Sequence, residues 1–196
     1  MKLRWVRVTS RQIAQMNVAV VLFAIAITGL LKAQPVEPDT DQVFYALGHD
    51  PDRLIPLERQ TATIHTSAKF VGIGATAKSF SEFKPGKSPV RLSSNATEFV
   101  VRSPLSNSPV DFNSFYVLRS LSPKGSKREL LISKSHAFIG VAGSSSNLAE
   151  GELPITFAKY GEHSLKITLA QPLRPGEYAL SNRAAFLNLF CFGVDE

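Results

Sequence analysis

The chain has 196 residues, 44% of them hydrophobic, and carries a formal net charge of +6 at pH 7. Five of the 22 basic residues lie within residues 1–33, whereas all 16 acidic residues come later in the chain. Residues 34–196 therefore hold 17 basic and 16 acidic residues, a balance that argues against nucleic-acid binding, and we expect no nucleic-acid partner.

The first 33 residues have the pattern of an export signal. Basic residues come first, and an apolar run without charge follows over residues 18–31. As a helix this run would span about 21 Å, which is shorter than the ~30 Å hydrocarbon core of a bilayer. A signal peptide cleaved after Ala33 and a retained N-terminal anchor are the two alternatives. Both predict a periplasmic or extracellular domain and limit contact with the membrane to residues 18–31.

Residues 34–41 contain two prolines and three acidic residues without an apolar period, and they predict a short flexible leader. From there a single domain, residues 42–196, shows short β-prone runs between clusters of Gly, Pro, Asn and Ser. The first two runs, 43–47 and 54–57, flank a segment rich in turn residues. This arrangement predicts a β-hairpin.

The middle of the chain continues in the same way. Separate strands are expected at 61–66 and 69–73, where β-prone residues recur. Two further pairs of runs flank turn-forming residues and predict hairpins, namely 89–92 with 97–102 and 115–121 with 127–133.

The last third carries the clearest strand pattern. In 163–170, Leu and Ile alternate with polar residues, which is typical of a half-buried strand. Pro175-Gly176 then predicts a type II turn with Gly at the position of positive φ. In the final run, alternation places Cys191 on the face opposite Phe190 and Phe192, which predicts a small buried side chain rather than a reactive thiol.

These runs amount to about ten to twelve strands at a spacing typical of sandwiches and barrels. The predicted fold class is all-β, an antiparallel β-sandwich with a barrel as the alternative, preceded by the N-terminal signal or hydrophobic helix. Residues 180–189 are the one candidate for a short helix, with a loop as the alternative. The lone cysteine excludes an intrachain disulfide, so packing must stabilise the domain.

The sequence contains partial matches to functional motifs, but the residues around them do not fit those motifs. The run Gly72–Ala77 has the spacing of a dinucleotide fingerprint, but no helix-forming stretch follows it. Asp50 and Asp52 have the alternation of a calcium loop, whose twelfth position would be Thr61 instead of Glu. The four histidines are scattered without metal-ligand spacing, at positions His49, His65, His136 and His163.

No nucleophile motif such as GxSxG or SxxK occurs in the sequence. The only Trp is Trp5, which leaves residues 34–196 without the aromatic type that most often stacks on sugars. Four glutamates could supply a carboxylate pair for glycoside hydrolysis or could equally be solvated side chains on strands, namely Glu58, Glu98, Glu152 and Glu177. We therefore assign no catalytic, cofactor-binding or metal-binding residue, and no cofactor.

The segment Leu173–Leu180 and the ending 190–195 resemble the C-terminal part of uncharacterised exported bacterial β-domain proteins. The runs 55–59 and 88–92 belong to the same pattern. More broadly, the Leu-x-Pro-Gly-x-Tyr-x-Leu spacing is similar to hairpins of immunoglobulin-like and transthyretin-like sandwich domains. The resemblance implies a sandwich architecture and carries no activity.

We expect from these observations a non-catalytic binding or protein-interaction domain of the bacterial cell envelope, with an unidentified protein partner. Pairing through an exposed strand edge is the expected mode. A hydrolase acting on envelope glycan or peptide and a carrier of a small ligand inside a barrel are the two alternatives.

Overall fold

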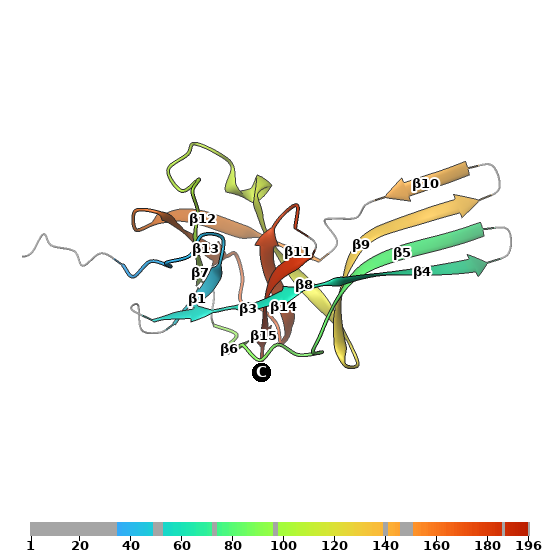
Figure 1. Ribbon diagram of the computed structural model, residues 1–196, viewed down its shortest axis with the longest axis horizontal. Helices are drawn as coiled ribbons and strands as arrows, with labels where there is room; N and C mark the ends of the chain where they lie inside the picture. Colours follow the sequence, from blue (N-terminus) through green and yellow to red (C-terminus); the bar gives the residue numbers. More distant parts are fainter. Residues whose placement is uncertain are drawn as a thin grey trace, which may run out of the picture. The chain divides into compact units, whose positions relative to one another are not determined.

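A computed structural model describes residues 35–48, 53–71, 74–95, 98–138, 141–145, 151–185 and 187–195. Within these ranges the chain forms fifteen β-strands and one short 3-10 helix, η1 (Phe112–Ser114), and it contains no α-helix (Figure 1). The all-β fold class is therefore confirmed, and 180–189 holds the end of one strand and the start of the next. The expected signal or anchor, residues 1–33, lies outside the described residues. In the part of the chain that is described, no helix is long and apolar enough to cross a membrane.

The smaller of the two sheets has five antiparallel strands. Their order is β12 (Ile155–Tyr160), β13 (Ser164–Leu169), β7 (Glu98–Arg102), β1 (Phe44–Leu47) and β2 (Leu54–Pro56). The predicted first hairpin is confirmed, because Leu47 pairs with Leu54 and the Gly48 N–H donates to the Arg53 carbonyl at 3.2 Å. The alternating strand predicted near residue 165 is β13, whose Leu165, Ile167 and Leu169 are buried.

The larger sheet curls. Its main path is β3 (Glu58–Thr61), β15 (Asn188–Val194), β14 (Gly176–Asn182), β8 (Tyr116–Lys124), β9 (Lys127–Phe138), β5 (Gly74–Phe83) and β4 (Thr63–Val71). Only Ala62 separates β3 from β4 in the chain, so the two ends of this path are consecutive in sequence. Three short strands pair beside the path, namely β10 (Val141–Ser145) with β9, β11 (Glu152–Leu153) with β8, and β6 (Arg91–Leu92) in parallel with β15.

The strands β8, β14 and β15 are buried on both faces. One face packs with the five-stranded sheet in the main apolar cluster, to which they contribute Leu118, Leu180 and Phe192. The other face lines the inside of the curled sheet, where Cys191 packs with Phe83 and other apolar residues. Phe192 and Cys191 thus lie in different clusters, which confirms the predicted alternation along this strand.

The structure corrects two predicted turns. The runs 89–92 and 97–102 do not form a hairpin, because β6 pairs with β15 whereas β7 pairs with β1 and β13 in the other sheet. Pro175-Gly176 does not form a type II turn, because Gly176 lacks a positive φ and begins β14. In both places the turn residues connect two sheets, and turn chemistry alone does not distinguish a crossover from a hairpin.

Two predicted strands, 61–66 and 69–73, are replaced by one continuous strand, β4, which pairs with β5 over nine consecutive residues. Residues 74–77 of the dinucleotide-like pattern are the first residues of β5, which continues as a strand to Phe83. The strands predicted at 115–121 and 127–133 do form a hairpin, β8–β9, but its paired residues are Ser122–Lys124 and Lys127–Glu129, on either side of a tight turn at Gly125, where φ is +62°. Residues 116–121 of β8 pair instead with β11 and β14.

The segment before β1 is fastened to the five-stranded sheet through Glu37. Its carboxylate accepts hydrogen bonds from the backbone N–H groups of Glu162 and His163, at 2.5 and 2.9 Å, and from the Ser164 hydroxyl at 2.6 Å. Gly161 faces this carboxylate so closely that a Cβ would overlap it. The predicted flexible leader therefore has a specific contact within the domain.

This contact predicts a pH-dependent anchoring of the leader. Burial opposes ionisation of Glu37, but the hydrogen bonds from Ser164 and the two backbone N–H groups outweigh it and lower the pKa. A lowered pKa means that the contact stabilises the fold above the pKa of an unfolded Glu, about 4.3, and is lost as the pH falls through the folded value.

Glu37→Gln should therefore increase hydrogen exchange of the Glu162 and His163 amides at neutral pH, and the same increase should appear in the unchanged protein at acidic pH. Asp39→Asn is the matched control and should leave both amides protected. Unchanged exchange in the Gln variant would contradict this role of Glu37.

Candidate functional site

Among the residues that the structure describes, no three His, Cys, Asp or Glu side chains converge as a metal site requires. The described histidines lie on three separate elements, His65 on β4, His136 on β9 and His163 in the turn between β12 and β13. His49, Asp50 and Asp52 lie outside the described residues.

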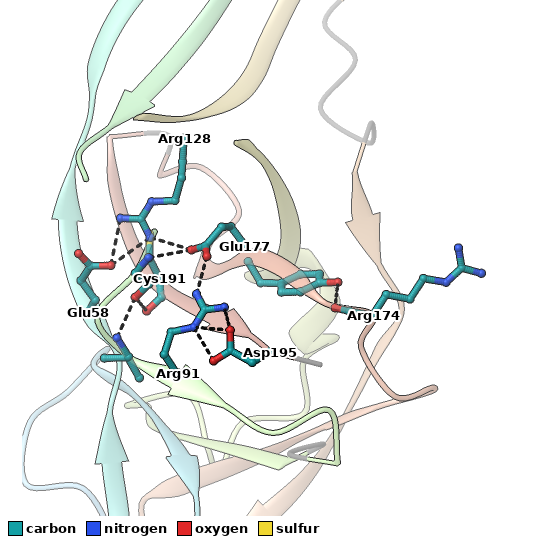
Figure 2. A network of polar contacts seen from close by, with 10 residues as sticks. Glu58, Arg91, Arg128, Arg174, Glu177, Cys191 and Asp195 are labelled. Carbon is teal, nitrogen blue, oxygen red and sulfur yellow. Dashed lines mark hydrogen bonds and ion pairs between the residues drawn. The ribbon is translucent and has the colours of Figure 1, made fainter. Parts of the chain in front are cut away.

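A network of buried charges occupies one end of the curled sheet (Figure 2). Arg128 on β9 is fully buried, and its guanidinium nitrogens lie 3.0 Å from the Glu58 carboxylate and 3.4 Å from the Glu177 carboxylate. Arg91 contacts the other oxygen of Glu177 at 2.5 Å and also binds Asp195. The network therefore joins β3, β6, β9 and β14 with the C-terminal end of β15.

Each carboxylate of this network is paired with an arginine. Figure 2 shows Arg128 between Glu58 and Glu177, so the two carboxylates neutralise a guanidinium and do not face each other across a substrate site. Burial raises the pKa of the neighbouring Cys191 thiol to about 12. At neutral pH this thiol is protonated, and a protonated thiol is a poor nucleophile.

The other two candidate glutamates are also paired with cations. Glu152 on β11 accepts two hydrogen bonds from Arg183, at 2.8 and 2.9 Å, and one from the buried Arg119 at 3.2 Å. Glu98 on β7 pairs with Lys166 at 2.8 Å. The structure thus brings Glu58 and Glu177 together and places Glu98 and Glu152 elsewhere.

Inside the curled sheet, buried apolar side chains form a cluster that includes Phe83, Leu121, Leu130 and Leu189. A shallow cleft of about 390 Å³ lies elsewhere, beside Leu173 and Tyr178. The Tyr178 hydroxyl already donates to the Arg174 carbonyl at 2.7 Å. The buried apolar cluster occupies part of the space in which a barrel carrier would hold its ligand.

A four-stranded arm is the part of the domain that offers backbone groups to a partner. It consists of β4, β5, β10 and the part of β9 beyond Glu129. In the described structure these segments pair with one another, except that Glu82 and Phe83 at the end of β5 pair with Glu129 and Arg128. Figure 1 shows them side by side with β4 at one edge. Among the described strands β4 pairs with β5 alone, so its other side presents N–H and C=O groups that no described strand pairs with along Thr63–Val71.

The two faces of the arm differ in character. One face holds a shallow cleft of about 260 Å³ lined by His65, Ser67, Lys69, Thr76, Lys78, Phe80 and Lys124. On the other face of β4, Ile64 is 56% exposed and Phe70 is 81% exposed. Four large hydrophobic side chains are exposed in the described ranges, and these two belong to the same strand. The open edge thus separates a basic face from a face with two exposed apolar residues.

The direction of the β4 backbone groups follows from its pairing. Val71 pairs with Gly74, and two residues separate them in the chain. In hairpins of this length the two flanking residues form main-chain hydrogen bonds with each other. Alternation along β4 then directs the odd-numbered residues toward β5 and leaves the even-numbered backbone groups outward. The outward groups belong to Ile64, Thr66, Ala68 and Phe70.

Sequence reasoning predicted an open edge as the mode of binding but did not locate it. It divided this segment into two strands, 61–66 and 69–73. The run of β-prone residues without proline over residues 61–73 was the available signal. A comparison of the chain with protein-family models, curated proteins and solved structures finds no match.

Proposed function

We propose that this chain is an exported, non-catalytic interaction domain of the bacterial cell envelope, an antiparallel β-sandwich that binds a protein partner by adding a strand to β4. The observation that carries the proposal is the open edge of nine residues with Ile64 and Phe70 exposed beside it. Added strands bind through main-chain hydrogen bonds and gain specificity from alternate side chains. The edge supplies both.

Natural sheets protect their edges with proline, bulges, short strands or a covering element. β4 has no proline and no register shift against β5. Charged side chains also protect edges, and β4 carries His65 and Lys69, but both lie on the basic face. An edge of this length whose apolar face has no such protection is expected to be covered by a partner in the cell.

Ala68→Pro tests the proposal. The substitution removes an outward N–H group and should leave the bonds between β4 and β5 in place, because proline is tolerated at an edge where its N side faces solvent. We expect it to abolish crosslinks between the full chain and its partner in intact envelopes. Ala68→Val is the matched control, since it keeps the N–H group and fits a strand, and it should retain the crosslinks.

Hydrogen exchange of β5 and β9 should be equal in the two variants, which shows that the sheet is intact. Equal crosslinking by both variants would place the partner elsewhere and overturn the proposal. Turnover by the purified chain in a screen of envelope glycans and peptides would replace it with the hydrolase alternative.

A further inference from the structure

The outward groups of β4 and its exposed apolar side chains are arranged with a symmetry that a second copy of the same strand would satisfy. Ser67 is the central residue of the nine in β4. Ile64 and Phe70 lie three positions before and three positions after it, on the same face. We propose that the strand added to β4 is β4 of a second copy of this chain, antiparallel and centred on Ser67. The inference rests on the proposed function and names its partner.

The backbone permits this register. In an antiparallel pair, hydrogen-bonded residues lie opposite hydrogen-bonded residues, so the outward even-numbered groups of one copy must face even-numbered groups of the other. Centring on Ser67 places Ile64 opposite Phe70 of the second copy and Thr66 opposite Ala68. All four outward residues find partners, which gives about eight main-chain hydrogen bonds across the interface.

The side chains select this register among those that the backbone permits. Ile64 and Phe70 of the two copies form two apolar cross-strand pairs, and the smaller Thr66 and Ala68 fill the centre between them. Shifting the centre by one residue, to Thr66 or Ala68, removes both apolar pairs. Pairs of an aromatic and a β-branched residue directly opposite each other stabilise antiparallel strands beyond their main-chain hydrogen bonds.

The self-complementary order also explains why a second copy fits better than an unrelated strand. A two-fold interface uses the same patch on both subunits, so a residue and its partner must be related by symmetry in one sequence. Ile64 and Phe70 meet this condition about Ser67. An unrelated partner imposes no such condition on β4.

On the opposite face the same register places His65 opposite Lys69 of the second copy. The basic clefts of the two copies, which contain Lys69, Lys78 and Lys124, then come close together. Of the acids near them, Glu82 pairs with Lys127 and Glu129 pairs with Lys124 and Lys127. The interface therefore brings like charges together, and added salt should strengthen it through screening.

Cysteine crosslinking tests the register directly. In this arrangement Ser67 faces its own copy in a non-hydrogen-bonded pair, where Cα atoms lie about 4.5 Å apart, within disulfide reach. The full chain with Ser67→Cys should form a disulfide-linked dimer on mild oxidation. Chains with Thr66→Cys alone or Ala68→Cys alone should not, whereas a mixture of those two chains should. Cys191 is buried and is present in every variant, so the chain without an added cysteine shows the background level of crosslinking.

Sedimentation equilibrium of the chain without added cysteine should show a monomer–dimer equilibrium. Phe70→Ala should weaken it about tenfold, since two apolar pairs are lost per dimer, and Ala68→Pro should abolish it. A monomer at all concentrations, with no crosslink from Ser67→Cys, overturns the second copy as partner. If Ala68→Pro still removes crosslinks to another protein in that case, the proposed function stands. If those crosslinks persist, both proposals fail.

Discussion

Replacing Arg128 with Met is expected to lower the free energy of unfolding by about 3–5 kcal/mol, one of the two largest effects that we predict for this domain. The guanidinium is fully buried and faces the carboxylates of Glu58 and Glu177, which are 9% and 4% exposed. Methionine keeps the apolar packing of the arginine stem but ends where the guanidinium begins. The loss therefore reports Glu58 left without a cation and Glu177 left with Arg91 alone.

Urea unfolding of the two proteins measures this difference as a shift of the midpoint at constant slope. Combining Arg128→Met with Glu58→Gln removes one of the stranded charges, so the double variant should be more stable than the sum of the single effects predicts. Arg128→Lys keeps the charge but loses the planar fork, and we expect an intermediate loss. A loss below about 1 kcal/mol in the Met variant would mean that water reaches the carboxylates.

The sequence predicted the strands of this domain better than their partners. Strands such as β13 and β15 were evident because alternation and apolar runs are local signals of a pleated surface with one or two buried faces. The assignment of β6 and β7 to different sheets depends on contacts between distant residues. Ser93-Ser94-Asn95 has the same turn chemistry in a crossover as in a hairpin, so the predicted pairing was wrong.

The buried charges were beyond sequence reasoning for a related reason. Charged side chains on a strand are mostly solvated, and Glu177 was read as either solvated or catalytic. Its true environment depends on Arg128 and Arg91, which come from β9 and β6. Gly193 leaves room for Arg91, because a Cβ at that position would overlap the guanidinium. None of these residues is close to another in the chain, so no spacing pattern reveals the network.

The sequence led us to expect binding at an open strand edge, and this function stays a prediction. Neutral charge balance and missing catalytic motifs led to an interaction domain, and an open strand edge was the expected mode. Locating that edge required the topology, because any of the predicted strands could have been central. The exposure of Phe70 had no sequence signal, since most aromatic residues of this chain are core residues.

Phe192→Ala should also cost about 3–5 kcal/mol of unfolding free energy, for a reason unrelated to charge. The ring is fully buried between the two sheets, with its centroid 5.0 Å from that of Phe99 and 5.6 Å from that of Tyr178. Phe99 belongs to the five-stranded sheet and Tyr178 to the larger sheet. Truncation leaves a cavity that cannot collapse without moving strands of both sheets. The loss of unfolding free energy therefore exceeds the transfer free energy of the removed side-chain atoms.

Phe70→Ala is the matched control for this effect, because it removes the same side chain from an 81% exposed position. Measured by urea unfolding of dilute protein, where β4 is unpaired, it should change stability by less than about 0.5 kcal/mol. Equal losses in the two variants would show that Phe192 does not join the sheets. A large loss for Phe192 with none for Phe70 separates the roles of these rings, because one stabilises the fold and the other is available to a partner strand at the edge of the arm.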